Sequence, residues 1–228
     1  NSLIKIGHPT AIPFLQRALS DGYFKIPRKR VEFIVKILES LRWSPQSPRE
    51  KVFFWLAKKE KQKVVELKHE AVPTLVSLLT LKDDWDTIRQ VVELLGEIRD
   101  PAGADPLMDV FKSSLDGGLR MAVAESLGSI GDKKAIPVLV EALLNDQSVD
   151  VRASSASALG RIRSPEVVEP LCKSLSDKEG RVVQTAILAL GEVGEAKGVT
   201  CLCPVLNHDD RTIRTKAVEV FGKLGSKT

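Results

Sequence analysis

Apolar residues recur along most of the chain at three- and four-residue spacing, the pattern of a helix with one buried face. One clear stretch carries the apolar set Ile136, Leu139, Val140, Leu143 and Leu144. Pro137 fits this helix because proline is tolerated in the first turn. Runs that alternate with a period of two, which are typical of strands, are missing from the sequence. The pattern therefore predicts an all-α protein.

The helical pattern repeats every 31 or 32 residues, which is typical of arrays built from one supersecondary unit. Five glycines mark the period, in phrases such as "SLGSI" and "ALGRI": Gly96, Gly128, Gly160, Gly191 and Gly222. A second phrase, clearest as "KAIPVLVEALL", lies between them, and another copy starts at Thr10. Each unit is therefore predicted to be two helices. A glycine inside a helix costs roughly 1 kcal/mol, so its recurrence indicates close helix approach.

The phrase "GDKKAIPVLVEALLNDQSVDVRASSASALGRI" resembles the HEAT-like repeats named after phycobilisome (PBS) lyase subunits, and also the designed alphaRep proteins built from that consensus. About six copies cover nearly all of the chain outside one insertion. The resemblance implies a right-handed α-solenoid whose second helices line a concave face that commonly holds other proteins. It also implies that Asp/Arg pairs connect successive units through Arg120, Arg152 and Arg214, with Val183 as a departure.

We expect one α-solenoid domain over residues 1–228. It would comprise a partial repeat and a first repeat (1–41), a helical insertion (42–70) and five repeats (71–228). The phrase "SLIKIG" at Ser2 to Gly7 aligns with "SLGSIG" at Ser126 to Gly131. We therefore predict that the chain starts inside a second helix and is part of a longer array.

The insertion begins with "RWSPQSPREKVFFWLAKK", which holds two of the three tryptophans. Ser47 and Glu50 have the spacing of a capping box, and Pro48 would take the first helical position. We expect a helix from about Pro48 to Lys59 and a shorter one through Val64. The simplest interpretation is that the aromatic residues pack on the array and the lysines are solvated.

Positive charge is concentrated in the first part of the chain. Residues 1–68 hold 15 Lys/Arg and 6 Asp/Glu, net +9, and residues 69–228 hold 19 and 24, net −5. A basic surface neutralises phosphates, so nucleic-acid binding through segment 25–63 is an alternative function. The candidate patch consists of Lys25, Arg28, Lys29, Arg30, Arg42, Lys58, Lys59, Lys61 and Lys63. No recognition-helix motif or aromatic RNA-binding phrase accompanies it.

Catalytic and metal-binding patterns are also missing. His8, His69 and His208 fall in different units, and the single His69-Glu70 pair is too little for the iron site of deoxyhypusine hydroxylase, another HEAT-like protein. We therefore expect no catalytic residues, no metal, no cofactor and no enzymatic activity.

The three cysteines are an odd number and too few for a disulfide framework, which favours a reducing compartment. Cys172 and Cys203 occupy equivalent positions of adjacent first helices, where we expect both to be core residues. No run of about 18 apolar residues predicts a membrane span. The predicted location is cytoplasmic, with no membrane partner.

The predicted function is a non-enzymatic scaffold that binds a protein or peptide on the concave face. The predicted lining, counted from each inner glycine, is Arg89, Gln90, Glu93, Glu97, Met121, Glu125, Ser129, Ser154, Ser157, Arg161, Gln184, Thr185, Leu188, Glu192, Thr215, Lys216, Glu219 and Lys223. It has no sustained basic stripe or aromatic row, which favours a protein partner over nucleic acid. A bilin lyase-type chromophore-attachment subunit is the remaining alternative, on the family resemblance.

Overall fold

The computed structural model describes residues 9–22, 28–80 and 85–225, and no strand is present among them. The predicted all-α class is confirmed. The chain divides into two compact units, residues 1–94 and 95–228, and helix α7 (Trp85–Ile98) runs through the boundary. The expectation of one domain stays a prediction. The predicted start inside a second helix, at Ser2 to Gly7, lies outside the described residues.

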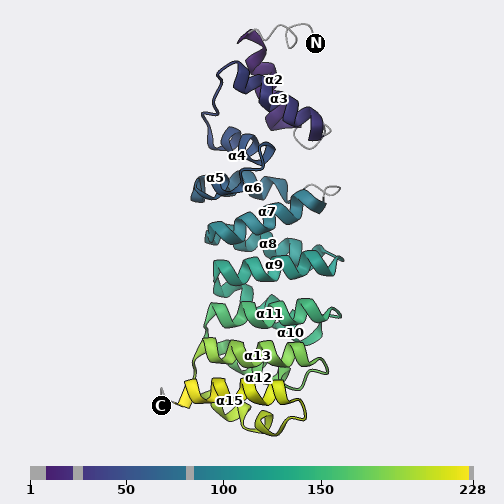
Figure 1. Ribbon diagram of the computed structural model, residues 1–228, viewed down its shortest axis with the longest axis vertical. Helices are drawn as coiled ribbons and strands as arrows, with labels where there is room; N and C mark the ends of the chain where they lie inside the picture. Colours follow the sequence, from purple (N-terminus) through teal and green to yellow (C-terminus); the bar gives the residue numbers. More distant parts are fainter. Residues whose placement is uncertain (1–8, 23–27, 81–84, 226–228) are drawn as a thin grey trace. The chain divides into compact units, whose positions relative to one another are not determined.

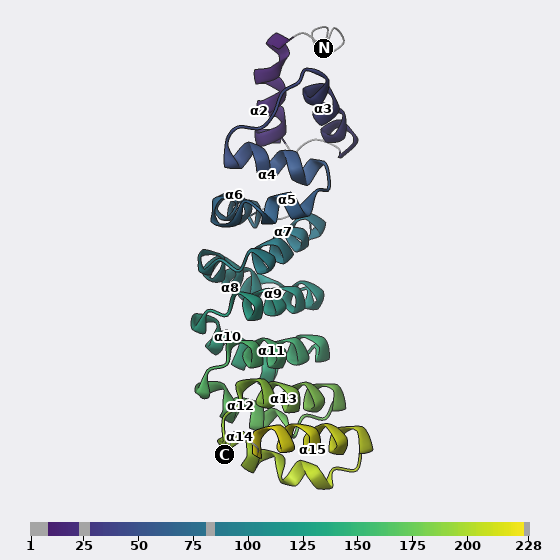
Figure 2. The same ribbon diagram turned by 60° about the vertical axis from the view of Figure 1, so that its left-hand side comes forward.

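Residues 95–225 form successive two-helix repeats, as the period predicted. The first helices are α8 (Ala104–Ser113), α10 (Ile136–Asn145), α12 (Val168–Ser174) and α14 (Lys197–Leu202). The second helices are α9 (Gly117–Ile130), α11 (Val149–Ile162), α13 (Gly180–Val193) and α15 (Arg211–Gly225). Within this unit the first helices form one layer and the second helices another (Figures 1 and 2).

Short 3₁₀ turns connect the helices of this unit. They are η3 (Pro101–Gly103), η4 (Lys133–Ala135), η5 (Pro165–Val167) and η6 (Pro204–Asn207). Helix α14 ends at Leu202, two residues before Pro204, which has no backbone N–H to continue the helical hydrogen bonds. Gly131 and Gly194 follow α9 and α13 with a φ of 77°, the left-handed conformation that ends many helices.

The other unit contains η1 (Pro9–Ala11), α2 (Ile12–Gly22), α3 (Arg28–Ser40), α4 (Pro48–Ala57), α5 (Lys61–Val65), η2 (Lys68–Glu70) and α6 (Val72–Leu78). The predicted capping box is confirmed at α4. The Glu50 N–H donates to Ser47 Oγ at 3.2 Å, and the Ser47 N–H donates to Glu50 Oε2 at 3.1 Å. Helix α4 ends two residues before the predicted boundary, since Lys59 has a φ of 61°.

Neighbouring second helices meet at the repeating glycine. A Cβ on Gly128 would lie 2.6 Å from Ala158 Cα, and one on Gly160 would lie 2.8 Å from Ala189 Cα. Both distances are too short for a side chain, so the predicted close approach is confirmed. Gly222 of α15 differs, because a Cβ there meets no atom within 4 Å.

The prediction for the cysteines is wrong. Cys172 of α12 and Cys201 of α14 form a disulfide with their Cα atoms 5.6 Å apart, and Cys203 is exposed. The error has a geometric cause. Equivalent residues on successive first helices point in the same direction, so a side chain on one helix meets a different position of the next.

None of the described helices is long and apolar enough to cross a membrane.

The glycine contacts predict opposite effects of one substitution at equivalent positions. Gly128→Ala should lower the free energy of unfolding by about 1–3 kcal/mol, because its Cβ overlaps backbone atoms of α11. Gly222→Ala should raise it by about 0.5–1 kcal/mol, since alanine favours helix and has room. Urea unfolding followed by circular dichroism measures both. Equal effects would contradict the close approach at Gly128.

The disulfide predicts a redox-dependent stability. Closing a loop of 29 residues should stabilise the fold by about 3.5 kcal/mol. Reduction with dithiothreitol, or Cys172→Ser, should therefore lower the unfolding midpoint, and Cys203→Ser serves as the control with no effect. Mass spectrometry of the unreduced protein identifies the pairing, and a Cys201–Cys203 or Cys172–Cys203 bond would contradict the structure.

Candidate functional site

The second-helix surface is the name used here for the predicted binding residues that lie on α9, α11, α13 and α15. All of them are exposed or half-buried except Ser154, which is buried. Apart from Ser154, the predicted residues thus lie at the surface of second helices, which follow one another along this unit (Figure 1). That they form a concave binding face stays a prediction.

Carboxylates recur on this surface. Glu125, Glu192 and Glu219 are exposed on α9, α13 and α15, and Leu188 of α13 is 41% exposed among them. Glu97 of α7 is also exposed. The charged surface is mixed, since Arg161, Lys216 and Lys223 lie on the same helices.

Polar contacts join neighbouring helices beneath these carboxylates. Ser154 Oγ donates to Glu125 Oε1 at 3.3 Å, and Arg161 donates to Ser129 Oγ at 3.3 Å. In the unit formed by residues 1–94, Lys61 Nζ donates to Glu93 Oε2 at 3.1 Å, and the predicted residues Arg89 and Gln90 are exposed and half-buried, respectively.

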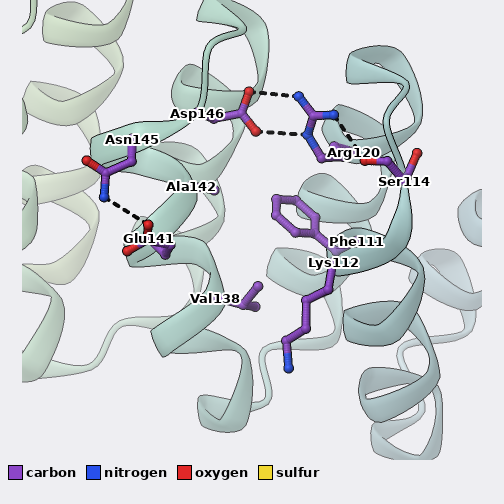
Figure 3. Close-up of a pocket in the computed structure, with 9 residues that line it drawn as sticks. All are labelled: Phe111, Lys112, Ser114, Arg120, Val138, Glu141, Ala142, Asn145 and Asp146. Atoms are coloured by element: carbon purple, nitrogen blue, oxygen red, sulfur yellow. Dashed lines mark hydrogen bonds and ion pairs between the residues drawn. The ribbon is translucent and has the colours of Figure 1, made fainter.

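Arginine–aspartate pairs connect successive repeats, as predicted. Arg120 of α9 donates two hydrogen bonds to Asp146, at 2.8 and 2.9 Å, and a third to the Ser114 carbonyl (Figure 3). Arg152 of α11 bonds Asp177 in the same bidentate way, at 2.7 and 2.9 Å. The planar guanidinium fits a carboxylate with two parallel bonds. We call these two pairs the Arg–Asp ladder.

The ladder changes at the next two repeats. Where Val183 replaces the arginine, Arg181 forms an ion pair with Asp150 of α11 instead. Arg214 donates to the carbonyls of His208 and Asp209, at 2.6 and 2.8 Å, and has no carboxylate partner within the described part of the chain. The predicted pairing through Arg214 is therefore not formed here.

A pocket of about 320 Å³ lies next to the first pair of the ladder. Phe111, Val138 and Ala142 supply its apolar wall, and Arg120 and Asp146 lie at its rim (Figure 3). These two charges neutralise each other, so the pocket's most prominent polar groups are already satisfied.

Four of the nine residues of the predicted basic patch form ion pairs. Lys58 binds Glu39 and Glu60, at 2.8 and 3.0 Å. Lys59, Lys61 and Lys63 pair with Glu32, Glu93 and Glu60, at 3.5, 3.1 and 2.7 Å. Lys29 and Arg30 are exposed at the start of α3. Lys25 and the Arg28 side chain lie outside the described residues.

An aromatic pocket between the end of α3 and helix α4 was not predicted. It measures about 380 Å³ and is lined by Trp43, Phe54 and Trp55 with Arg42, Lys51 and Lys58. Phe54 is buried, whereas Trp43 and Trp55 are half-buried, so the interpretation that the aromatics simply pack on the array is incomplete. The clustering of tryptophan with basic residues was the available signal.

Comparison with known proteins gives the family. The family model for HEAT repeats matches residues 31–128, 72–156 and 136–222, most of the chain. The chain belongs to the HEAT-repeat family.

Two curated relatives of this HEAT-repeat protein differ in function. It is 26% identical to the phycocyanobilin lyase subunit alpha of Picosynechococcus over 64% of the chain and 50% of the relative. It is 31% identical to deoxyhypusine hydroxylase of Mus musculus over 57% of the chain and 45% of the relative. The chain spans about half the length of these relatives. The predicted resemblance to the phycobilisome lyase type of HEAT-like repeat is confirmed.

A solved structure shares the fold. The complex of CpcE and CpcF of phycocyanin lyase from Nostoc sp. PCC7120 aligns with a TM-score of 0.59 and 22% identity, over 68% of this chain and 65% of that chain. The predicted α-solenoid class is confirmed.

The described residues contain no group of three or more His, Cys, Asp or Glu that could hold a metal ion. His208 lies in the turn before α15, where its Nδ1 accepts the Asp210 N–H at 3.0 Å. His69 lies in η2, and His8 lies outside the described residues.

The ladder shifts the pKa of both aspartates. Burial alone would raise the pKa of Asp146, but the hydrogen bonds from Arg120 and from the Ser148 N–H outweigh it and hold that pKa below its usual value. The pKa of Asp177 is lowered in the same way, against burial, by Arg152 and the Glu179 N–H. Both carboxylates therefore stay ionised between the HEAT repeats.

These shifts predict a loss of stability in acid. A lowered folded pKa stabilises the protein above the unfolded pKa, about 4, and this stabilisation is lost as the pH falls through the folded value. Melting temperatures measured from about pH 6 down to pH 2 should fall. The double variant Asp146→Asn/Asp177→Asn should start lower and fall less. Glu169→Gln, which removes an exposed ion pair with Lys173, should follow the parent curve.

Proposed function

We propose that this chain is a non-enzymatic HEAT-repeat scaffold that binds a protein or peptide partner through the second-helix surface. The observation that carries the proposal is the recurrence of exposed carboxylates at Glu125, Glu192 and Glu219, with the exposed apolar side chain of Leu188 beside them. Exposed carboxylates repel nucleic-acid phosphates, and mixed polar and apolar surfaces are typical of protein interfaces.

The Arg–Asp ladder supports this assignment by removing cations from the recognition surface. Arg120 and Arg152 direct their donors at aspartates in the turns between repeats, so their charges are already neutralised. The ladder holds the repeats in a fixed register, and a fixed register presents the second-helix residues as one continuous surface. A rigid surface lowers the ordering cost of binding.

Nucleic-acid binding through segment 25–63 is less well supported than the charge count suggested. Four of the predicted basic residues are paired with glutamates. A cation that must exchange a carboxylate for a phosphate gains less than a free one.

A lyase-type role is the second candidate, and the phycocyanobilin lyase subunit alpha among the relatives favours it. In that case the partner would be a protein that receives a chromophore. Co-purification of the chain with a bilin, visible as an absorbance band, would favour the lyase role over a plain scaffold.

The cytoplasmic location that we predicted rested on the cysteine count. The Cys172–Cys201 disulfide removes that argument, because disulfides persist mainly in oxidising compartments. We therefore base no part of the proposed function on a compartment.

The proposal predicts a charge-dependent partner. We expect a pull-down from a native lysate, after nuclease treatment and at high salt, to retain a discrete protein. The triple variant Glu125→Lys/Glu192→Lys/Glu219→Lys should retain about tenfold less of it. The matched control is Glu141→Lys/Glu166→Lys/Glu169→Lys, which reverses three exposed charges on α10, η5 and α12.

The outcomes separate the candidates. Equal loss in both triple variants would contradict the second-helix assignment. Material that is recovered from an untreated lysate and lost after nuclease treatment would favour the basic segment.

A further inference from the structure

We propose that the aromatic pocket defined above, lined by Trp43, Phe54, Trp55, Arg42 and Lys51, is a docking site for an acidic peptide segment. One apolar side chain of the peptide would enter between the aromatic rings, and flanking carboxylates would bind Arg42 and Lys51. This site lies within residues 1–94 and is independent of the second-helix surface, so either assignment can fail without the other.

The ring geometry suits an apolar side chain. Trp43 lies edge to face with Phe54, with 5.7 Å between centroids and 68° between planes, and Phe54 meets Trp55 at 4.8 Å and 74°. The plane of each ring is thus steeply inclined to that of its neighbour, and the pocket wall presents both ring faces and ring edges. An aliphatic or aromatic side chain fills such a space from several sides and buries apolar area.

The same geometry disfavours a nucleobase. Phe54 is steeply inclined to both tryptophan rings, so a flat base cannot stack between Phe54 and either of them. Lys63 Nζ also lies 4.1 Å from the centre of the Trp55 ring, and Lys58 Nζ lies 5.5 Å from it. The cations occupy positions over the Trp55 ring that a base would need for stacking.

The charges of the pocket favour an anionic partner. Lys58 and Glu39 neutralise each other across the wall, and Glu60 accepts a second bond from Lys58. These bonds raise the pKa of Lys58, and the bond to Glu39 contributes more than the bond to Glu60. The positive charge of Lys58 is therefore already neutralised within the protein. Arg42 and Lys51 have no ion-pair partner in the described part of the chain. The pocket therefore presents two available cations beside an apolar wall.

The backbone at Arg42 provides an unusual test. Arg42 has a φ of 55°, and its N–H bonds the Glu39 carbonyl while the Trp43 N–H bonds the Leu38 carbonyl. This is the Schellman arrangement, in which glycine is the preferred residue. Arg42→Gly therefore removes the guanidinium and keeps the favoured backbone.

Lys59 offers a matched control. It has a φ of 61° and ends α4 in the same arrangement, but it does not line the pocket. Lys59→Gly thus changes the same charge at the same kind of backbone position. Both variants should melt at or above the parent temperature, because glycine relieves the left-handed strain.

The probe is a set of fluorescein-labelled nonapeptides in which a central Leu, Met, Phe or Pro is flanked by Asp and Glu. Control peptides carry Asn and Gln in place of the acids, or Ser at the centre. Fluorescence anisotropy with the oxidised full chain measures their dissociation constants. We expect at least one acidic peptide to bind about tenfold more tightly than both of its controls.

The variants decide whether this binding occurs in the pocket. Arg42→Gly and Lys51→Gln should each weaken it about tenfold, and Lys59→Gly less than about twofold. Equal effects of Arg42→Gly and Lys59→Gly would show general charge attraction and overturn the proposal, as would a set in which no acidic peptide exceeds its controls. Tighter binding of labelled oligo-dT or oligo-U, lost in Arg42→Gly, would reassign the pocket to nucleic acid.

Discussion

The repeats of residues 95–225 depend on the close contact between successive second helices. At Gly128 and Gly160 the next helix lies where a Cβ would be, so the backbones themselves set the spacing. At two of these boundaries the Arg–Asp ladder also fixes the turns, with two parallel bonds per pair. The glycine contacts and the Arg–Asp pairs thus constrain the same interface between repeats. The positions of the surface residues follow from this spacing.

The period of the sequence predicted this interface because each repeat meets its neighbour through the same positions. The recurring glycine therefore predicted the close approach found at Gly128 and Gly160, although Gly222 does not share it. The capping box at Ser47 and Glu50 was predictable for a related reason, since it is a local arrangement set by spacing alone. Features that follow from the repeat period, or from the spacing of residues within one helical turn, could be derived from the sequence.

Features that depend on unlike positions meeting in space could not be derived. Cys172 and Cys203 are equivalent, but equivalence in a repeat predicts parallel direction rather than contact, and the bond joins Cys172 to Cys201. Lys58 pairs with Glu39, 19 residues away, and Lys61 pairs with Glu93, 32 residues away. The apolar run from Val52 to Ala57 has no one-sided period, so the sequence did not reveal that Trp55 is only half-buried while its neighbours are buried.

The disulfide has a further consequence for how the array opens. In a linear array each repeat touches only its neighbours, so local unfolding proceeds one repeat at a time. The bond between α12 and α14 joins two consecutive repeats covalently. When it is formed, neither first helix can detach far from the other, and the two repeats open as a single cooperative segment. The oxidation state of one sulfur pair thus decides whether these two repeats fluctuate separately or as one piece.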